Sequence, residues 1–145
     1  MKGGETMADY WQWKGNLDLG AGYLTFVKGS PVIVVSANIT AELTGDTTYT
    51  SAETSILDFN SILLETQMTT GGRTAKVVID GAMSSGGTLT SIIDKDTSAQ
   101  MTVTATASKT VKFMGLPDYL GISMTLSAGM TAGSSVSVKI LPLNL

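Results

Sequence analysis

The sequence predicts an all-β protein, an antiparallel β-sandwich with about eight strands and little helix. Three observations lead to this prediction. Serine and threonine supply roughly a quarter of the 145 residues, 16 residues are glycine, and strong helix formers are few. Apolar and polar side chains alternate with a period of two in several segments. Glycine or polar breaks separate these segments every ten to fifteen residues or so, as in a sandwich or barrel.

The predicted strands follow one another along most of the chain. They are Ala21–Val27, Val32–Ala41, Ile62–Met68, Ala75–Asp80, Leu89–Ile93, Met101–Ala107, Ile122–Leu126 and Ser135–Ile140. The breaks between them contain residues that favour turns, namely Gly71-Gly72, Gly86-Gly87, Asp94-Lys95-Asp96, Gly129 and Gly133. Residues 50–60 have two interpretations, a short helix opened by Ser51 or a strand edge formed by Ile56, Leu57 and Phe59.

The last three predicted strands have the clearest alternation. Threonine occupies one face of Met101–Ala107, and Met, Val and Ala occupy the other. Strands that are apolar on one face only are typical of antiparallel sheets. We therefore expect a common set of side chains to point into the core: Val103, Ala105, Val136, Val138 and Ile140.

The composition disfavours most catalytic chemistry. The chain has no His and no Cys, so neither Ser-His-Asp nor Cys-His nucleophiles can form within it, and zinc, haem and iron–sulfur centres lose their usual ligands. We expect a protein that is not an enzyme and has no catalytic residues, no cofactor and no metal site. The carboxylates of Glu53, Asp58 and Glu65 could supply an acid and a base, but their spacing does not select them from 12 acidic residues.

Partners are also restricted by charge and hydropathy. A net charge of −3 with scattered basic residues argues against binding of nucleic acid. The longest apolar run, Pro31–Val35, is far shorter than the roughly 20 residues that span a bilayer, so we expect no membrane association. The first residues show no apolar signal segment, and we expect synthesis in the cytoplasm.

Two short motifs are better explained as turns than as ligand sites. In Asp94–Ser98 two carboxylates lie two residues apart, as in a calcium-binding loop. The glycine and the later glutamate of an EF-hand are missing. Gly71-Gly72-Arg73-Thr74 has glycines before a basic residue, but the spacing of a phosphate-binding loop is absent.

Four residues are candidates for an interface. In an extended Tyr10-Trp11-Gln12-Trp13 segment both Trp side chains lie on one face and Tyr10 on the other. The Trp side chains either anchor a partner or close one end of the core. Arg73, the only arginine, could bind a partner's carboxylate or be an ordinary surface residue. We expect an aromatic arm over residues 1–16 and one sandwich domain over 17–145.

A series of motifs resembles a known family. The series is Leu17-Asp18-Leu19-Gly20, then Gly29–Val35, then Leu116–Leu126 and Ser135–Ile140. In this order the motifs resemble the small capsid cement, or decoration, proteins of tailed bacteriophages, of the jelly-roll type typified by a Bordetella podophage. The resemblance covers most of residues 17–140. Basic residues common in the family after the Tyr-Leu pair are replaced here by Gly121 and Ser123.

The resemblance implies a structural protein of the virion that binds and stabilises the outer surface of the phage head. Its partners would be the major capsid protein of the same phage and further copies of itself, as a homodimer or homotrimer. The alternatives are a head-fibre or tail component, or a β-sandwich that binds a receptor or a carbohydrate. The last of these would need aromatic platforms such as Trp11, Trp13 or Tyr49.

Overall fold

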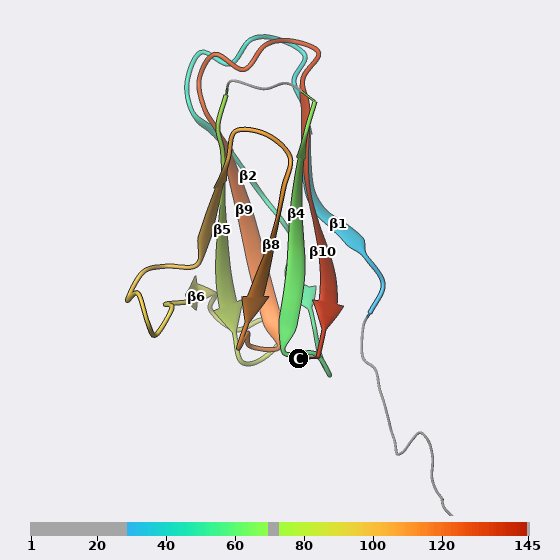
Figure 1. Ribbon diagram of the computed structural model, residues 1–145, viewed down its shortest axis with the longest axis vertical. Coiled ribbons are helices and arrows are strands. Elements are labelled where there is room, and N and C mark those ends of the chain that lie inside the picture. The colour runs from blue at the N-terminus through green and yellow to red at the C-terminus, as the bar shows by residue number, and fades with distance from the viewer. Residues whose placement is uncertain (1–28, 70–72, 145) are drawn as a thin grey trace, which may run out of the picture.

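Two antiparallel sheets pack face to face in the computed structural model, which describes residues 29–69 and 73–144 (Figure 1). Within these ranges there are ten strands and no helix. The strands are β1 (Val32–Asn38), β2 (Thr47–Thr50), β3 (Thr54–Ser55), β4 (Ser61–Met68), β5 (Ala75–Ala82), β6 (Thr90–Ser91), β7 (Thr102–Ala105), β8 (Lys109–Met114), β9 (Tyr119–Leu126) and β10 (Ser135–Leu143).

The order of strands is that of a jelly roll. One sheet has the order β1-β10-β4-β8, and the other has β2-β9-β5-β6. Strands β2 and β3 pair with successive parts of β9, and β7 and β6 pair with successive parts of β5. Each pair therefore occupies one position, which leaves four positions in each sheet and eight in the sandwich. The predicted antiparallel sandwich of about eight strands is confirmed.

The core lies between the two sheets and is built from alternate residues of the central strands. Strand β9 contributes Leu120, Ile122, Met124 and Leu126, all fully buried. The five side chains predicted to point inward are buried as well: Val103, Ala105, Val136, Val138 and Ile140. A register shift between Ile33 and Val35 in β1 directs Val35 into the core and leaves Ile33 exposed.

Two edge strands were not predicted. Strand β8 alternates Lys and Thr on its exposed face with Val111 and Phe113, which pack against the core. Strand β2 has four residues, of which Tyr49 packs against the core. Lysine and short length are common at sheet edges, where they limit pairing with other chains. They also weaken the hydrophobic signal on which strand prediction depends.

Two other predictions need correction, and a third lies outside the described residues. The predicted strand Leu89–Ile93 is reduced to Thr90–Ser91, because only these residues pair with β5. In residues 50–60 there is neither a helix nor a strand edge at Ile56, Leu57 and Phe59: the strand β3 consists of Thr54 and Ser55. Buried Ile56 then opens a turn in which Asp58 has a φ of 71°. The predicted strand Ala21–Val27 and the domain boundary at residue 16 are outside the described ranges.

The hydroxyl of Thr66 is an exception in an otherwise apolar core. Thr66 lies on the inner face of β4 and is fully buried, and its Oγ1 has no hydrogen-bond partner within the described ranges. An unpaired buried hydroxyl destabilises the folded state because it loses its hydrogen bonds to water. We expect Thr66→Val to raise the free energy of unfolding by about 1 kcal/mol.

Thermal denaturation of Thr66→Val beside Thr102→Val tests this prediction. Thr102 is exposed on β7, so its replacement controls for the general preference of valine for strands. A Thr66→Val protein that melts at or below the wild-type temperature would show that the hydroxyl is satisfied in the native protein.

Candidate interaction surface

Three loops meet at the end of the sandwich toward which β5, β8 and β10 run, which is the lower end in Figure 1. They comprise residues 56–60, 83–89 and 115–118. The Ile56 amide donates to the Asp118 carbonyl at 2.8 Å, and the Leu116 amide donates to the Asn60 carbonyl at 3.0 Å. These bonds tie the first and third loops together. We refer to this region as the lower end.

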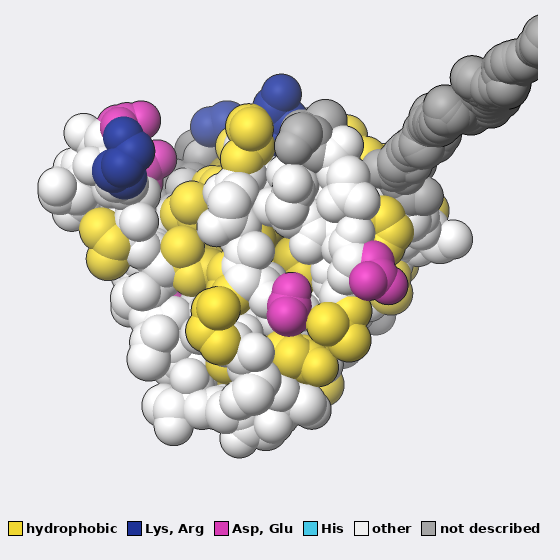
Figure 2. All heavy atoms as spheres, turned by 90° about the horizontal axis from the view of Figure 1, so that it is seen from below, with side chains coloured by type: hydrophobic (Ala, Val, Ile, Leu, Met, Phe, Trp, Pro, Cys, Tyr) yellow, Lys and Arg dark blue, Asp and Glu magenta, His cyan; other side chains and the backbone are white. Residues whose placement is uncertain are grey.

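The exposed large hydrophobic side chains of the described residues are distributed unevenly. They are Val32, Ile33, Leu57, Met83, Leu89, Ile93 and Met114. None of them lies in the loops 39–46, 106–108 and 127–134 at the opposite, upper end. Figure 2 shows hydrophobic side chains spread over the lower end. Met83 is the most exposed of the set at 82%. One end of the sandwich therefore presents apolar surface to solvent.

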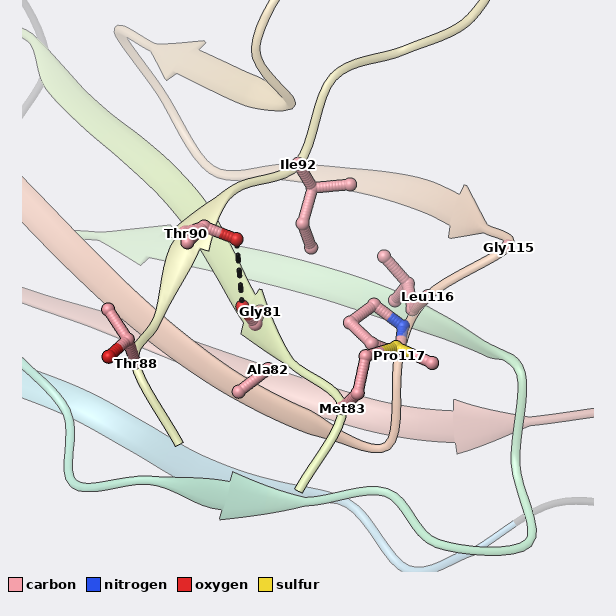
Figure 3. Close-up of a pocket in the computed structure, with 9 residues that line it drawn as sticks. All are labelled: Gly81, Ala82, Met83, Thr88, Thr90, Ile92, Gly115, Leu116 and Pro117. Atoms are coloured by element: carbon pink, nitrogen blue, oxygen red, sulfur yellow. Dashed lines mark hydrogen bonds between the residues drawn. The ribbon is translucent and has the colours of Figure 1, made fainter. Parts of the chain in front are cut away.

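A cleft of about 440 Å³ opens at the lower end. Figure 3 shows its lining, with Ile92, Leu116, Pro117 and Met83 directed toward the space between the chain segments. The complete lining is Gly81, Ala82, Met83, Thr88, Thr90, Ile92, Gly115, Leu116 and Pro117. The cleft is lined largely by apolar side chains, which suits an apolar or aromatic group.

Two glycines allow the cleft wall to lie close to the sheet. A Cβ added at Gly81 would lie 2.4 Å from Pro117 Cγ, and one at Gly121 would lie 2.4 Å from Leu89 Cδ1. Thr90 Oγ1 donates to the Gly81 carbonyl at 3.4 Å, the bond drawn in Figure 3. Glycine at these positions thus lets the loop before β9 and the segment around β6 pack directly on β5 and β9.

The upper end is polar by comparison. A hollow of about 460 Å³ is lined by residues 38–47 and by Tyr49. Asp46 Oδ1 accepts a hydrogen bond from the Ala128 amide at 3.0 Å. The Leu43 amide donates to the Met130 carbonyl, and the Gly129 amide donates to the Leu43 carbonyl. Two loops distant in sequence are thereby joined into one rim.

Arg73, predicted as an interface residue, belongs to this upper end. It is exposed, and its Nε donates to the Gly129 carbonyl at 2.9 Å. The guanidinium thus supports the loop of residues 127–134, at the opposite end from the cleft. The other three predicted interface residues, Tyr10, Trp11 and Trp13, lie outside the described residues.

The candidate acidic groups serve separate local structures. Glu53 accepts hydrogen bonds from Ser85 Oγ and the Gly86 amide, whereas Glu65 Oε1 lies 3.9 Å from Lys139 Nζ. Asp94 Oδ1 accepts from the amides of Asp96 and Thr97 at 2.8 and 2.9 Å. These backbone bonds, that to Thr97 foremost, lower the pKa of the Asp94 carboxyl. The predicted turn at Asp94–Ser98 is confirmed.

The predicted interface residues include none of those that form the lower end, such as Met83, Met114, Leu116 and Pro117. Their signal in the sequence is weak: Met83 follows a predicted strand, and Leu116 and Pro117 begin one of the motifs that resemble cement proteins. Each is a single apolar residue in or beside a loop, where no periodicity marks it.

Comparisons with family models, with curated proteins and with solved structures find no match to this chain. In the described ranges no helix is long and apolar enough to cross a membrane. The same ranges contain no cluster of three or more Asp or Glu side chains placed to hold a metal ion.

Proposed function

We propose that this chain is a structural protein of a phage virion, a cement or decoration protein that binds the outside of the head and stabilises the shell. Its partners are the major capsid protein of the same phage and further copies of itself. It is made in the host cytoplasm and acts without catalysis. The proposal rests on the motifs of residues 17–140 and on the surface of the jelly roll.

The apolar lower end is the observation that carries the proposal. A protein that adheres to an assembled shell needs a surface whose burial offsets the entropy lost on binding. Leu57, Met83 and Met114 are each about half or more exposed and lie at one end of the sandwich. Burial of such side chains contributes favourable free energy at roughly 25 cal/mol per Å² of apolar area. Contacts repeated over a symmetric lattice multiply the total stabilisation.

A second candidate function is recognition of a carbohydrate or receptor. The upper-end hollow favours it, because polar groups surround one half-buried aromatic ring, that of Tyr49. An aromatic face with neighbouring hydrogen-bonding groups is a common arrangement for binding sugars. Loss of glycan binding in a Tyr49→Ala variant would favour this function over attachment to a head.

The proposed function is tested on purified heads with and without the protein. Because the protein binds the assembled shell, we expect heads that carry it to release DNA at a higher temperature. Cryo-electron microscopy should place its density on the outer surface of the head. Equal release temperatures, or density on the tail alone, would contradict the proposal.

A matched pair of variants shows whether the lower end makes the contact. Leu57→Asp places one carboxylate at the lower end, and Ala132→Asp places one in an exposed loop of the upper end. We expect Leu57→Asp to reduce occupancy on heads at least tenfold, since a buried unpaired charge is costly, and Ala132→Asp to leave it unchanged. Loss of occupancy in Ala132→Asp but not in Leu57→Asp would assign the contact with the head to the upper end.

A further inference from the structure

The lower-end cleft has the form and composition of a receptor for aromatic side chains. Its lining includes Ile92, Leu116 and Pro117, and Met83 stands at its rim, 82% exposed. Met114, 53% exposed, ends strand β8 just before the cleft residue Gly115. Methionine thioethers make favourable contacts with aromatic rings and adapt to their shape. An aromatic occupant fits such a rim better than a charged one.

The chain itself contains a segment of matching chemistry. It has two Trp, four Tyr and three Phe, and five of these nine, including both Trp, belong to residues 1–28. Residues 29–144, by contrast, contain no tryptophan. The Tyr10-Trp11-Gln12-Trp13 sequence concentrates three of these rings in four residues.

The point at which this segment joins the sandwich is close to the cleft. The Gly29 amide donates to the Pro142 carbonyl at 2.8 Å, next to the end of β10. Leu143 of β10 pairs with Ser61 of β4, and Ser61 pairs with Met114 of β8. Two strand spacings, roughly 10 Å, therefore separate the end of β10 from the rim of the cleft.

The length of the segment is sufficient for docking within one molecule. Trp11 precedes Gly29 by 18 residues, and an extended chain of that length spans up to about 60 Å. A linker of this length gives a local concentration of the order of millimolar, far above that of a second molecule in dilute solution. Docking within the molecule is therefore favoured over capture of a neighbour's segment.

We propose that Tyr10–Trp13 of each free molecule docks into its own lower-end cleft, with Trp11 or Trp13 against Met83. This inference does not depend on the virion role, because it concerns the isolated protein. It predicts that the cleft is filled before the protein meets a partner.

The two tryptophans provide a direct test, since all tryptophan fluorescence arises from this segment. In the full chain at low concentration we expect emission at shorter wavelength, and severalfold weaker quenching by acrylamide, than in a synthetic peptide of residues 1–28. Met83→Asp should move both properties to those of the peptide. Met83 is largely exposed, so this variant should keep its far-UV circular dichroism; Met114→Asp is the second variant if it does not.

Ile33→Asp is the matched control. Ile33 is 57% exposed on β1, near a separate hollow of about 310 Å³ lined by Pro31, Leu63 and Leu141 among others. We expect this variant to keep the wild-type fluorescence. If Ile33→Asp but not Met83→Asp exposed the tryptophans to solvent, the proposal would be overturned, and the segment would be assigned to the sheet face near Ile33. Wild-type fluorescence equal to that of the peptide would also overturn the proposal. Tryptophan burial that disappears on dilution would overturn it as well, because the segment would then dock on a second copy of the chain.

Discussion

Replacement of Leu64 by alanine is expected to lower the free energy of unfolding by about 2–5 kcal/mol. Leu64 lies on β4, between β10 and β8, and its side chain is fully buried between the two sheets. Truncation removes apolar contacts and leaves a cavity that the two sheets can fill only by shifting toward each other. Equilibrium unfolding in urea, monitored by circular dichroism, measures the change.

Leu63→Ala is the matched control, because the neighbouring residue points to the opposite face of the same strand. Leu63 is half-buried on the outer face of the sheet, so its truncation leaves no internal cavity. We expect a loss of about 1 kcal/mol or less at this position. Similar losses for the two variants would mean that β4 is not held in the register described, since a shift by one residue exchanges the two faces.

Gly81→Ala is expected to produce the next largest loss, about 1–3 kcal/mol, and to alter the cleft. Gly81 faces inward on β5, where a Cβ would lie 2.4 Å from Pro117 Cγ and 3.0 Å from Ile92 Cδ1. Pro117 is a rigid ring, and the next residue, Asp118, is held by the amide of Ile56. The added methyl group can be accommodated only if the loop of residues 115–118 shifts. Urea unfolding gives the energy, and amide chemical shifts of residues 115–118 locate the shift.

Gly121→Ala serves as the comparison for Gly81→Ala. Its Cβ would come equally close, 2.4 Å, to Leu89 Cδ1, but that atom is the end of a flexible side chain that is 38% exposed. Leu89 can rotate toward solvent at small cost, so we expect a loss below about 1 kcal/mol. If Gly121→Ala proved the more damaging of the two, the close packing of β5 against Pro117 would not be the constraint that we describe.

The fold could be predicted from the sequence where a strand buries one face. Strands β7 and β10 alternate cleanly, and their inward residues Val103, Val136, Val138 and Ile140 were identified correctly. Strand β8 alternates as well, but Lys109 and Lys112 reduce its mean hydropathy. Strand β8 lies at an open sheet edge, where such residues are tolerated, and they weaken the pattern that its half-buried Val111 and Phe113 provide.

The candidate surface could not be predicted in the same way. Leu57, Met83 and Met114 come from three parts of the chain and are brought to one end only by the pairing of β4, β5, β8 and β9. A single apolar residue in a loop has no periodicity, and an exposed one is unremarkable by itself. The aromatic content of residues 10–13, in contrast, is evident from the sequence without any structure.

The position of β9 and β10 has a consequence for how the chain folds. These strands are the last two in sequence, yet each lies inside its sheet, with β9 between β2 and β5 and β10 between β1 and β4. A nascent chain that has not yet reached Tyr119 therefore has no partner for β1, β2 or β3, whose described pairings are all with β9 or β10. Folding is slow when segments distant in sequence must meet before any strand pairing stabilises them. Sandwiches of this kind fold on the order of milliseconds to seconds. During that interval the unpaired strands are open to association with other chains, so high expression and elevated temperature should favour aggregation of the nascent protein over its folding.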